Sequence, residues 1–128
     1  MITFVIVNFN RHDLTARCLE ALYAHSKNFA CVVVDNGSTP ENREALETQV
    51  LPRWPVKYVQ TENEHGYSTG ANAGILTASP GSDIVWLNND CFLTCDAVAV
   101  IEKAFAETGA GIVGALLRYP DGKIQHDG

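Results

Sequence analysis

The chain has 128 residues, which is the usual length of one domain, and hydrophobic residues make up 46% of it, enough for a packed core. Lys and Arg number 9 against 15 Asp and Glu, for a formal net charge of −6 at pH 7. This acidic balance argues against a nucleic-acid-binding protein, which needs a basic face for the phosphate backbone. A single nucleotide remains compatible with it, because a divalent metal ion can bridge carboxylates and phosphates.

Apolar runs rich in β-branched and aromatic residues alternate with helical stretches. The runs predict buried strands at residues 2–7, 31–34, 56–59, 83–87 and 111–117. Helices are expected at residues 14–26, 40–50, 70–78 and 96–107. The side chains expected to cap three of these helices are Asn10, Thr39 and either Thr94 or Asp96, and a turn is expected at residues 120–122.

Strands that alternate with helices predict an α/β fold with a mostly parallel sheet and helices on both faces. In such sheets, ligands bind beyond the carboxyl ends of the strands. Four segments in these positions are rich in Asn, Asp and Gly. They are residues 8–10, 35–38, 61–70 and 88–90. We therefore expect them to converge on one ligand site.

Two of these strand ends carry hard oxygen donors. Asp35 could accept hydrogen bonds from a ribose or a base, or it could instead stabilise the turn that follows it. Because it ends a strand, we expect Asp35→Ala to cost little stability. Asn88 and Asp90 offer oxygens that suit Mg²⁺ or Mn²⁺ completed by water and phosphates, with an Asx turn as the alternative reading.

Residues 66–70 read Gly-Tyr-Ser-Thr-Gly, which matches the G-x-S-x-G pattern of serine hydrolases. A hydrolase would use Ser68 as the nucleophile, Asp83 or Asp90 as the orienting acid and His126 as the base. Against this alternative, residues 62–65 separate the preceding strand from the serine, and no second oxyanion-loop motif is present. The same segment fits neither a dinucleotide fingerprint nor a P-loop.

No apolar run approaches the ~20 residues that span a bilayer, so no transmembrane segment is predicted. The apolar start of the chain lacks the basic flank and the cleavage site of a signal peptide. The four cysteines do not show the paired spacing of a structural zinc site, and we expect buried free thiols. These features predict a cytoplasmic protein.

The motifs in chain order resemble those of glycosyltransferase family 2, which has the GT-A fold, and in particular its bacterial rhamnosyltransferase-like branch. The matching segments are residues 5–10, 34–38, 63–75, 87–90 and 120–125. Two positions depart from the family pattern. Asn88 stands in place of the first Asp of the D-x-D motif, and Ala71 stands where many members carry an Arg before the Asn at position 72.

The resemblance implies a truncated, Rossmann-like GT-A domain in which residues 1–128 form the N-terminal, donor-binding part and the acceptor half is absent. It implies inverting transfer of a sugar from a nucleotide-diphosphate donor, with dTDP-rhamnose as the first choice, to a saccharide acceptor in surface polysaccharide synthesis. The parent protein could lie peripherally at a membrane. No acidic residue after Asp90 matches the family's catalytic base, so we expect an inactive fragment, and a nucleotide-binding module without catalysis is the alternative.

The resemblance also implies site residues. Asp90 would bind the divalent ion, Mg²⁺ or Mn²⁺, that bridges the diphosphate. Asp35, with Asn8 nearby, would hold the base or ribose, while Asn88 would contact the donor sugar or ribose. The full set of expected nucleotide-sugar contacts is Asn8, Asn10, Asp35, Asn63, Gly66, Asn72, Asn88 and Asn89.

Overall fold

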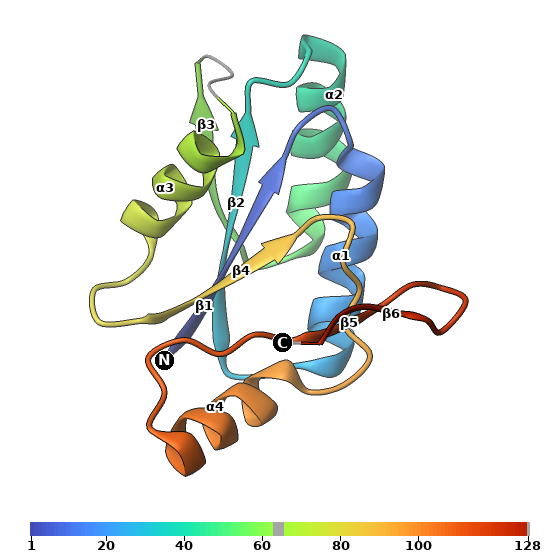
Figure 1. Cartoon of the computed structure of the whole chain (residues 1–128). Coiled ribbons are helices and arrows are strands. Elements are labelled where there is room, and N and C mark those ends of the chain that lie inside the picture. Colours follow the sequence, from blue (N-terminus) through green and yellow to red (C-terminus); the bar gives the residue numbers. More distant parts are fainter. Residues whose placement is uncertain (63–65, 128) are drawn as a thin grey trace.

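The computed structural model describes residues 1–62 and 66–127 (Figure 1). Its strands are β1 (Ile2–Asn8), β2 (Phe29–Asn36), β3 (Lys57–Thr61), β4 (Asp83–Asn88), β5 (Leu116–Arg118) and β6 (Ile124–Asp127). Its helices are α1 (His12–His25), α2 (Pro40–Ala45), α3 (Tyr67–Thr77) and α4 (Ala97–Thr108). A π turn (Leu46–Val50) and a 3-10 turn (Leu51–Arg53) continue α2.

The first four strands form one parallel sheet in the order β3-β2-β1-β4. The register is flush at one end, because Val7 of β1 pairs with Val34 of β2 and with Asn88 of β4. The carboxyl ends of these strands therefore meet at a single edge, and in Figure 1 their arrowheads run from β3 at the upper left to β4 at the centre right. The α/β fold and the parallel sheet predicted from the sequence are confirmed.

Alternating side chains of β1 build a hydrophobic layer on each face of the sheet. Phe4 and Ile6 pack in the cluster that contains α1 residues and the π turn that continues α2, whereas Val7 packs beneath α3 with β2 residues. Figure 1 shows α1 and α2 on one side of the sheet and α3 on the other. Burial on both faces explains why the strand sequences are continuous apolar runs.

Two glycines one turn apart let α3 lie against the sheet. A Cβ at Gly74 would come within 2.3 Å of Val5 Cγ1, and one at Gly70 within 3.0 Å of Val7 Cγ1. Residues 67, 70 and 74 share one face of a helix, so this close approach also brings Tyr67 down over the end of the sheet. Gly66, with a φ of 84°, makes the sharp entry into the helix.

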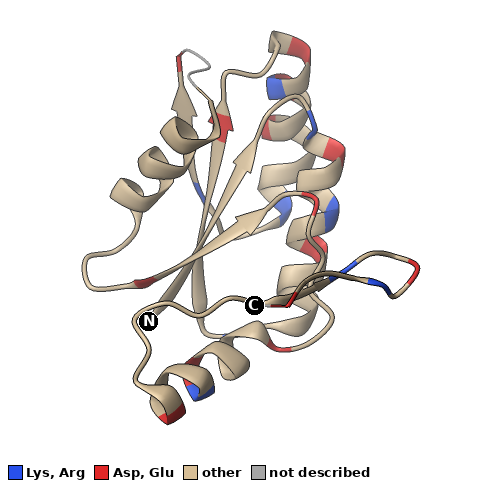
Figure 2. Ribbon diagram, in the orientation of Figure 1, with Lys and Arg blue, Asp and Glu red and all other residues tan. Residues whose placement is uncertain are grey.

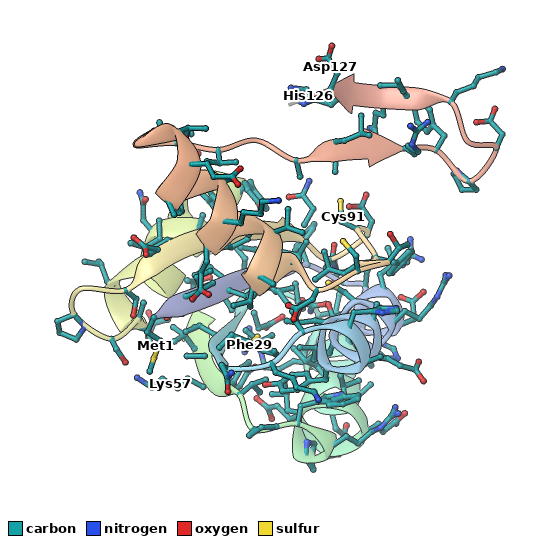
Figure 3. The ribbon with its side chains drawn as sticks, turned by 90° about the horizontal axis from the view of Figure 1, so that it is seen from below. Met1, Phe29, Lys57, Cys91, His126 and Asp127 are labelled. Atoms are coloured by element: carbon teal, nitrogen blue, oxygen red, sulfur yellow. The ribbon has the colours of Figure 1, made fainter. Side chains whose placement is uncertain are left out.

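The C-terminal segment corrects the expected fifth strand. Residues 111–117 do not join the parallel sheet. Instead, β5 pairs with β6 in a separate antiparallel hairpin, and Gly122 N–H donates to Tyr119 O (2.9 Å) at the expected turn. Figure 3 shows this hairpin, with His126 and Asp127 on β6, projecting beyond the main body. Leu116 and Ile124 are 52% and 55% exposed, so these apolar side chains of the hairpin are not buried in a hydrophobic core.

Two of the three expected helix caps are confirmed. Thr39 Oγ1 accepts a hydrogen bond from Asn42 N–H, and Asp96 Oδ1 accepts one from Ala99 N–H, each at 3.3 Å. The cap at Asn10 was wrong, because Asn10 Oδ1 accepts from Thr39 N–H (2.7 Å) instead. Asn10 has a φ of 52°, a left-handed conformation that asparagine tolerates, and it ties the β1–α1 loop to the start of α2.

The thiols agree in part with the sequence prediction. All four cysteines are free, but only Cys18 and Cys31 are buried, and burial raises the pKa of each of these two thiols to about 12. Cys95 is exposed.

Within residues 1–62 and 66–127, no helix combines the length and apolar character that crossing a membrane requires.

Candidate functional site

A cleft of about 440 Å³ opens at the carboxyl ends of β1, β2 and β4, beside the first turn of α3. Its volume lies in the range of small-molecule sites. The residues that line it are Val7, Phe9, Asn36, Tyr67, Asn88, Asn89 and Asp90. A cleft at this edge of the sheet is where an open α/β fold places its ligand.

Asn36 lines the cleft although sequence reasoning did not select it. It is buried at the end of β2, where its Nδ2 donates to Gly66 O (3.0 Å) and its Oδ1 accepts from Thr61 Oγ1 (2.9 Å). It thereby joins β2, β3 and the start of α3. Because adjacent strand residues face opposite sides, Asn36 faces α3 while Asp35 faces away from it. The sequence feature that could have identified Asn36 as a cleft residue is its position immediately after Asp35 at the end of a strand.

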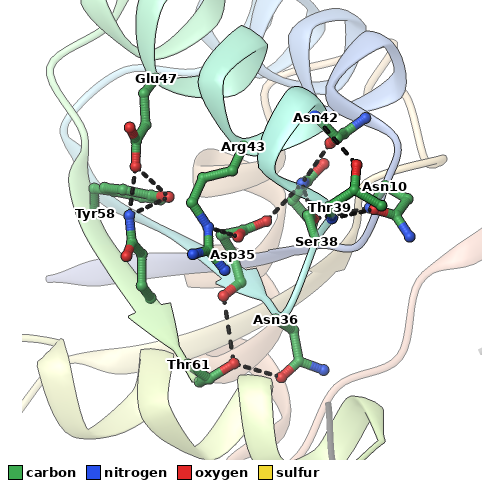
Figure 4. Close-up of polar contacts among 12 residues, drawn as sticks. Asn10, Asp35, Asn36, Ser38, Thr39, Asn42, Arg43, Glu47, Tyr58 and Thr61 are labelled. Atoms are coloured by element: carbon green, nitrogen blue, oxygen red, sulfur yellow. Dashed lines mark hydrogen bonds and ion pairs between the residues drawn. The ribbon is translucent and has the colours of Figure 1, made fainter. Parts of the chain in front are cut away.

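Asp35 does not line the cleft. Its carboxylate is fully buried on the α2 side of the sheet, where Oδ1 accepts from Asn8 Nδ2 (3.0 Å) and Oδ2 accepts from Arg43 Nε (2.8 Å) (Figure 4). The hydrogen bond that Arg43 donates to Asp35 raises the pKa of Arg43. Since both carboxylate oxygens are engaged within the protein, this geometry does not offer Asp35 to a ribose or base. The buried hydrogen bonds also argue against the expectation that Asp35→Ala costs little stability.

Asn8 is the centre of a buried polar network behind the cleft. Its Nδ2 also lies 3.1 Å from Ser38 Oγ, and its Oδ1 accepts from Thr15 Oγ1 (2.8 Å). Asn89 Nδ2 donates to the same Thr15 oxygen (3.1 Å). The network therefore ties together the ends of β1, β2 and β4, so Asn8 supports the cleft and Asn89 both supports and lines it.

The remaining expected contacts are dispersed. Asn10 holds the β1–α1 loop against Ser38, because its N–H donates to Ser38 Oγ (2.9 Å). Gly66 lies next to the cleft, because its carbonyl oxygen accepts a hydrogen bond from Asn36, which lines the cleft. Asn72 is exposed along α3 and does not line the cleft. Asn63 lies outside the described residues.

Asn88 and Asp90 are both exposed and both line the cleft, as predicted. Tyr67 O–H donates to Asn88 Oδ1 (2.7 Å), and the tyrosine ring stacks on Trp86 with centroids 6.0 Å apart. Burial, with Cys91 and Asp90 nearby, raises the pKa of Tyr67. The phenol therefore stays protonated at neutral pH and can act as the donor.

Asp90 supplies the acidic group of the cleft. Figure 2 shows charged residues on α1 and α2 and none on α3, so the α3 wall is neutral. Within the described part of the chain, no three His, Cys, Asp or Glu residues cluster as a metal cage. A single exposed carboxylate beside an open cleft fits Mg²⁺ or Mn²⁺ only as a shared ion, completed by ligand phosphates and water.

The hydrolase alternative does not match the local structure. β3 ends at Thr61, and Ser68 lies inside the first turn of α3 rather than at a tight turn that leads directly from a strand into a helix. A nucleophile elbow requires that direct turn to expose the serine. The candidate base, His126, lies on β6 of the hairpin.

The sequence matches a known family along nearly its whole length. The family model described as Glycosyl transferase family 2 covers residues 3–127. An uncharacterized protein, y4gI, from Sinorhizobium fredii is 32% identical over 103 residues, which are 79% of this chain and 11% of that protein. Glycosyltransferase GlyA from Streptococcus pneumoniae is 27% identical over 112 residues, or 87% of this chain and 16% of that protein. The chain thus spans a small part of both relatives.

Solved structures share the fold. A mannosyltransferase from Pyrobaculum calidifontis in complex with GDP-Man and Mn²⁺ superposes with a TM-score of 0.70 at 20% identity, covering 94% of this chain and 36% of that one. Residues 1–349 of TarS from S. aureus, in complex with UDP-GlcNAc, give a TM-score of 0.69 at 16% identity, covering 90% and 37%. These likenesses confirm the GT-A arrangement that was expected from the sequence. With the family model matched over residues 3–127, the chain belongs to glycosyl transferase family 2.

Proposed function

We propose that this chain binds the nucleotide-sugar donor of an inverting glycosyltransferase. The observation that carries the proposal is the cleft at the carboxyl ends of β1, β2 and β4, where Asn36, Asn88 and Asp90 meet. Family membership supports it, as do the GDP-Man and UDP-GlcNAc complexes of the two fold neighbours.

Residues that line the cleft and residues behind it have different roles in this proposal. Asn36, whose amide is held by Gly66 and Thr61, shapes the wall that faces the base or ribose, and Asp90 holds a divalent ion, Mg²⁺ or Mn²⁺, from the other wall. When bound, such an ion neutralises charge on the leaving diphosphate as a Lewis acid. Asp35, Arg43 and Asn8 act behind the cleft, where they hold the strand ends in place.

The finer assignments follow from the family resemblance and remain predictions. They are a dTDP-rhamnose donor, a saccharide acceptor in a surface polysaccharide, and a cytoplasmic reaction by a parent protein that is peripheral at a membrane. Among the described residues, Asp90 is the only acidic side chain that lines the cleft, and it is assigned to the ion. No catalytic base is therefore assigned, and we expect this chain to bind donor without transferring sugar.

The proposal is tested by calorimetric titration of the chain with UDP, GDP and dTDP, each with Mn²⁺ and with EDTA. We expect one nucleotide to bind about tenfold more tightly with Mn²⁺, and Asp90→Asn to remove that gain. Asp83→Asn is the matched control, because Asp83 is an exposed carboxylate at the opposite end of the same strand. It should leave binding unchanged.

The alternatives give different results. Binding that is indifferent to Mn²⁺ would favour a nucleotide-binding module without catalysis. Labelling of Ser68 by a fluorophosphonate would favour the hydrolase. If none of the three nucleotides binds under either condition, the donor-binding proposal is wrong.

A further inference from the structure

The second wall of the cleft carries an amide whose oxygen is already engaged. Tyr67 O–H lies 2.7 Å from Asn88 Oδ1. A carbonyl oxygen can only accept a hydrogen bond, so the phenol is the donor in this pair. Because the pKa of Tyr67 is raised, its proton is retained at neutral pH.

Three features hold Tyr67 in this position. Its ring stacks on Trp86 with an interplanar angle of 28°. Trp86 and Asn88 are two residues apart on β4, so both project from the same face of the strand, the face that α3 covers. Gly70 and Gly74 bring α3 close enough to the sheet for the phenol to reach the strand end. The contact is thus supported by the ring stacking and by the close approach of α3 to the sheet.

The consequence concerns the other end of the Asn88 carboxamide. Oxygen and nitrogen lie on different sides of the same carbon, so anchoring Oδ1 to Tyr67 turns Nδ2 away from the phenol. Among the residues that the structure describes, the side-chain hydrogen bond of Asn88 is the one that its Oδ1 accepts from Tyr67. Because Asn88 is exposed and lines the cleft, its two N–H groups are available to a ligand there.

We propose that Tyr67 is a positioning residue that makes Asn88 a hydrogen-bond donor to acceptor oxygens of the bound nucleotide, rather than a ligand of the metal ion. This inference rests on the proposed function and deepens it. Asp90 is then the residue that holds the ion, and the neutral amide two residues before it avoids a second negative charge beside an anionic ligand. The group of the nucleotide that Asn88 recognises is an oxygen that accepts a hydrogen bond, on either a phosphate or the ribose.

The experiment compares Tyr67→Phe, Asn88→Ala, Asn88→Asp and the double variant Tyr67→Phe with Asn88→Ala. Tyr119→Phe, at an exposed tyrosine next to the hairpin turn, is the matched control. The side-chain amide resonances of Asn88 are followed by ¹⁵N NMR in the free chain. Affinities are measured by calorimetry with Mn²⁺ for UDP, UMP and uridine, or for the corresponding diphosphate, monophosphate and nucleoside if GDP or dTDP is the nucleotide that binds, and Mn²⁺ alone is titrated as well.

We expect Tyr67→Phe to shift the Asn88 amide resonances and to weaken UDP binding by about threefold to tenfold. Asn88→Ala and Asn88→Asp should each weaken it by about tenfold, because both lack the N–H donors although Asn88→Asp keeps an acceptor for Tyr67. The double variant should match Asn88→Ala, since the tyrosine acts through the amide. A loss seen with UDP and UMP but not with uridine assigns the acceptor to phosphate, and an equal loss with uridine assigns it to ribose.

Several outcomes would overturn the inference. Unshifted Asn88 resonances in Tyr67→Phe would show that the phenol does not hold the amide. Additive losses in the double variant would show that the two residues act separately. If Asn88→Ala lowers the affinity for Mn²⁺ alone as far as Asp90→Asn does, Asn88 is a metal ligand. A wild-type chain that binds no nucleotide contradicts the donor-binding function and this role of Asn88, whereas normal binding by both Tyr67→Phe and Asn88→Ala contradicts this inference alone.

Discussion

Two regions of the molecule differ in the interactions that stabilise them. One is the parallel sheet with its helices (residues 2–88), and the other is the C-terminal segment (residues 110–127). Every residue of β1 is buried, and the polar groups at its carboxyl end are joined in one hydrogen-bonded network. In the C-terminal segment, Leu117 alone is even partly buried. The hairpin is held by its own ladder and turn, whereas the sheet is held by packing on two faces.

The difference explains where a ligand site can form. A binding site needs side chains whose positions are set by rigid surroundings. The ends of β1, β2 and β4 supply such surroundings, and the cleft is found there. Three pairs of substitutions, each making a comparable change in the two regions, test this contrast.

The largest difference is expected for the ion pairs. Arg43→Ala leaves the fully buried Asp35 carboxylate with Asn8 as its remaining side-chain partner, and we expect it to lower the free energy of unfolding by about 3 kcal/mol. Lys123→Ala removes a pair with Asp121 whose side chains are 82% and 56% exposed, and it should change stability by less than about 0.5 kcal/mol. Urea unfolding followed by circular dichroism measures both. Equal losses would mean that Asp35 is not held as the structure has it.

The next difference concerns the glycines. Gly74→Ala places a Cβ 2.3 Å from the buried Val5 side chain, so we expect a loss of about 2 kcal/mol from overpacking, although alanine ordinarily stabilises a helix. Gly111→Ala adds a Cβ into open space and should be neutral or slightly stabilising. Thermal unfolding of the two variants gives the comparison. A stabilised Gly74→Ala would show that α3 does not press against the sheet.

The smallest difference is expected for the loss of one methylene. Ile6→Val trims a side chain with no exposed surface and should cost about 1 kcal/mol, because the lost packing is not replaced. Ile112→Val trims a side chain that is 91% exposed and should change stability by less than about 0.5 kcal/mol. Chemical denaturation curves fitted with one common m-value for all variants resolve the two changes in the free energy of unfolding. A comparable cost at Ile112 would indicate that the C-terminal segment packs against something in solution.

Much of the fold and part of the site could be predicted from the sequence. The strands at 2–7 and 83–87 were placed to within one residue, and the expected convergence of strand ends was confirmed by the cleft. Asn88 and Asp90 were placed correctly because they follow a strand directly, and strand direction alone sends them to the ligand edge.

The exchange of roles between Asp35 and Asn36 could not be predicted in the same way. A strand buried on both faces has no alternation of polar and apolar residues, so its sequence does not indicate which side chain faces which helix. The carboxylate was chosen for its chemistry, yet it faces α2 and pairs with Arg43, while the neighbouring amide faces the cleft.

The amino-acid sequence by itself determined the order of strands and helices, the parallel sheet and the edge at which polar residues gather, because these follow from local patterns and from chain direction. The tertiary structure alone decided which of two adjacent residues enters the cleft, which partner β5 takes and how Tyr67 reaches Asn88. Each of these depends on contacts between segments that are distant in the chain, and local patterns carry no information about such contacts.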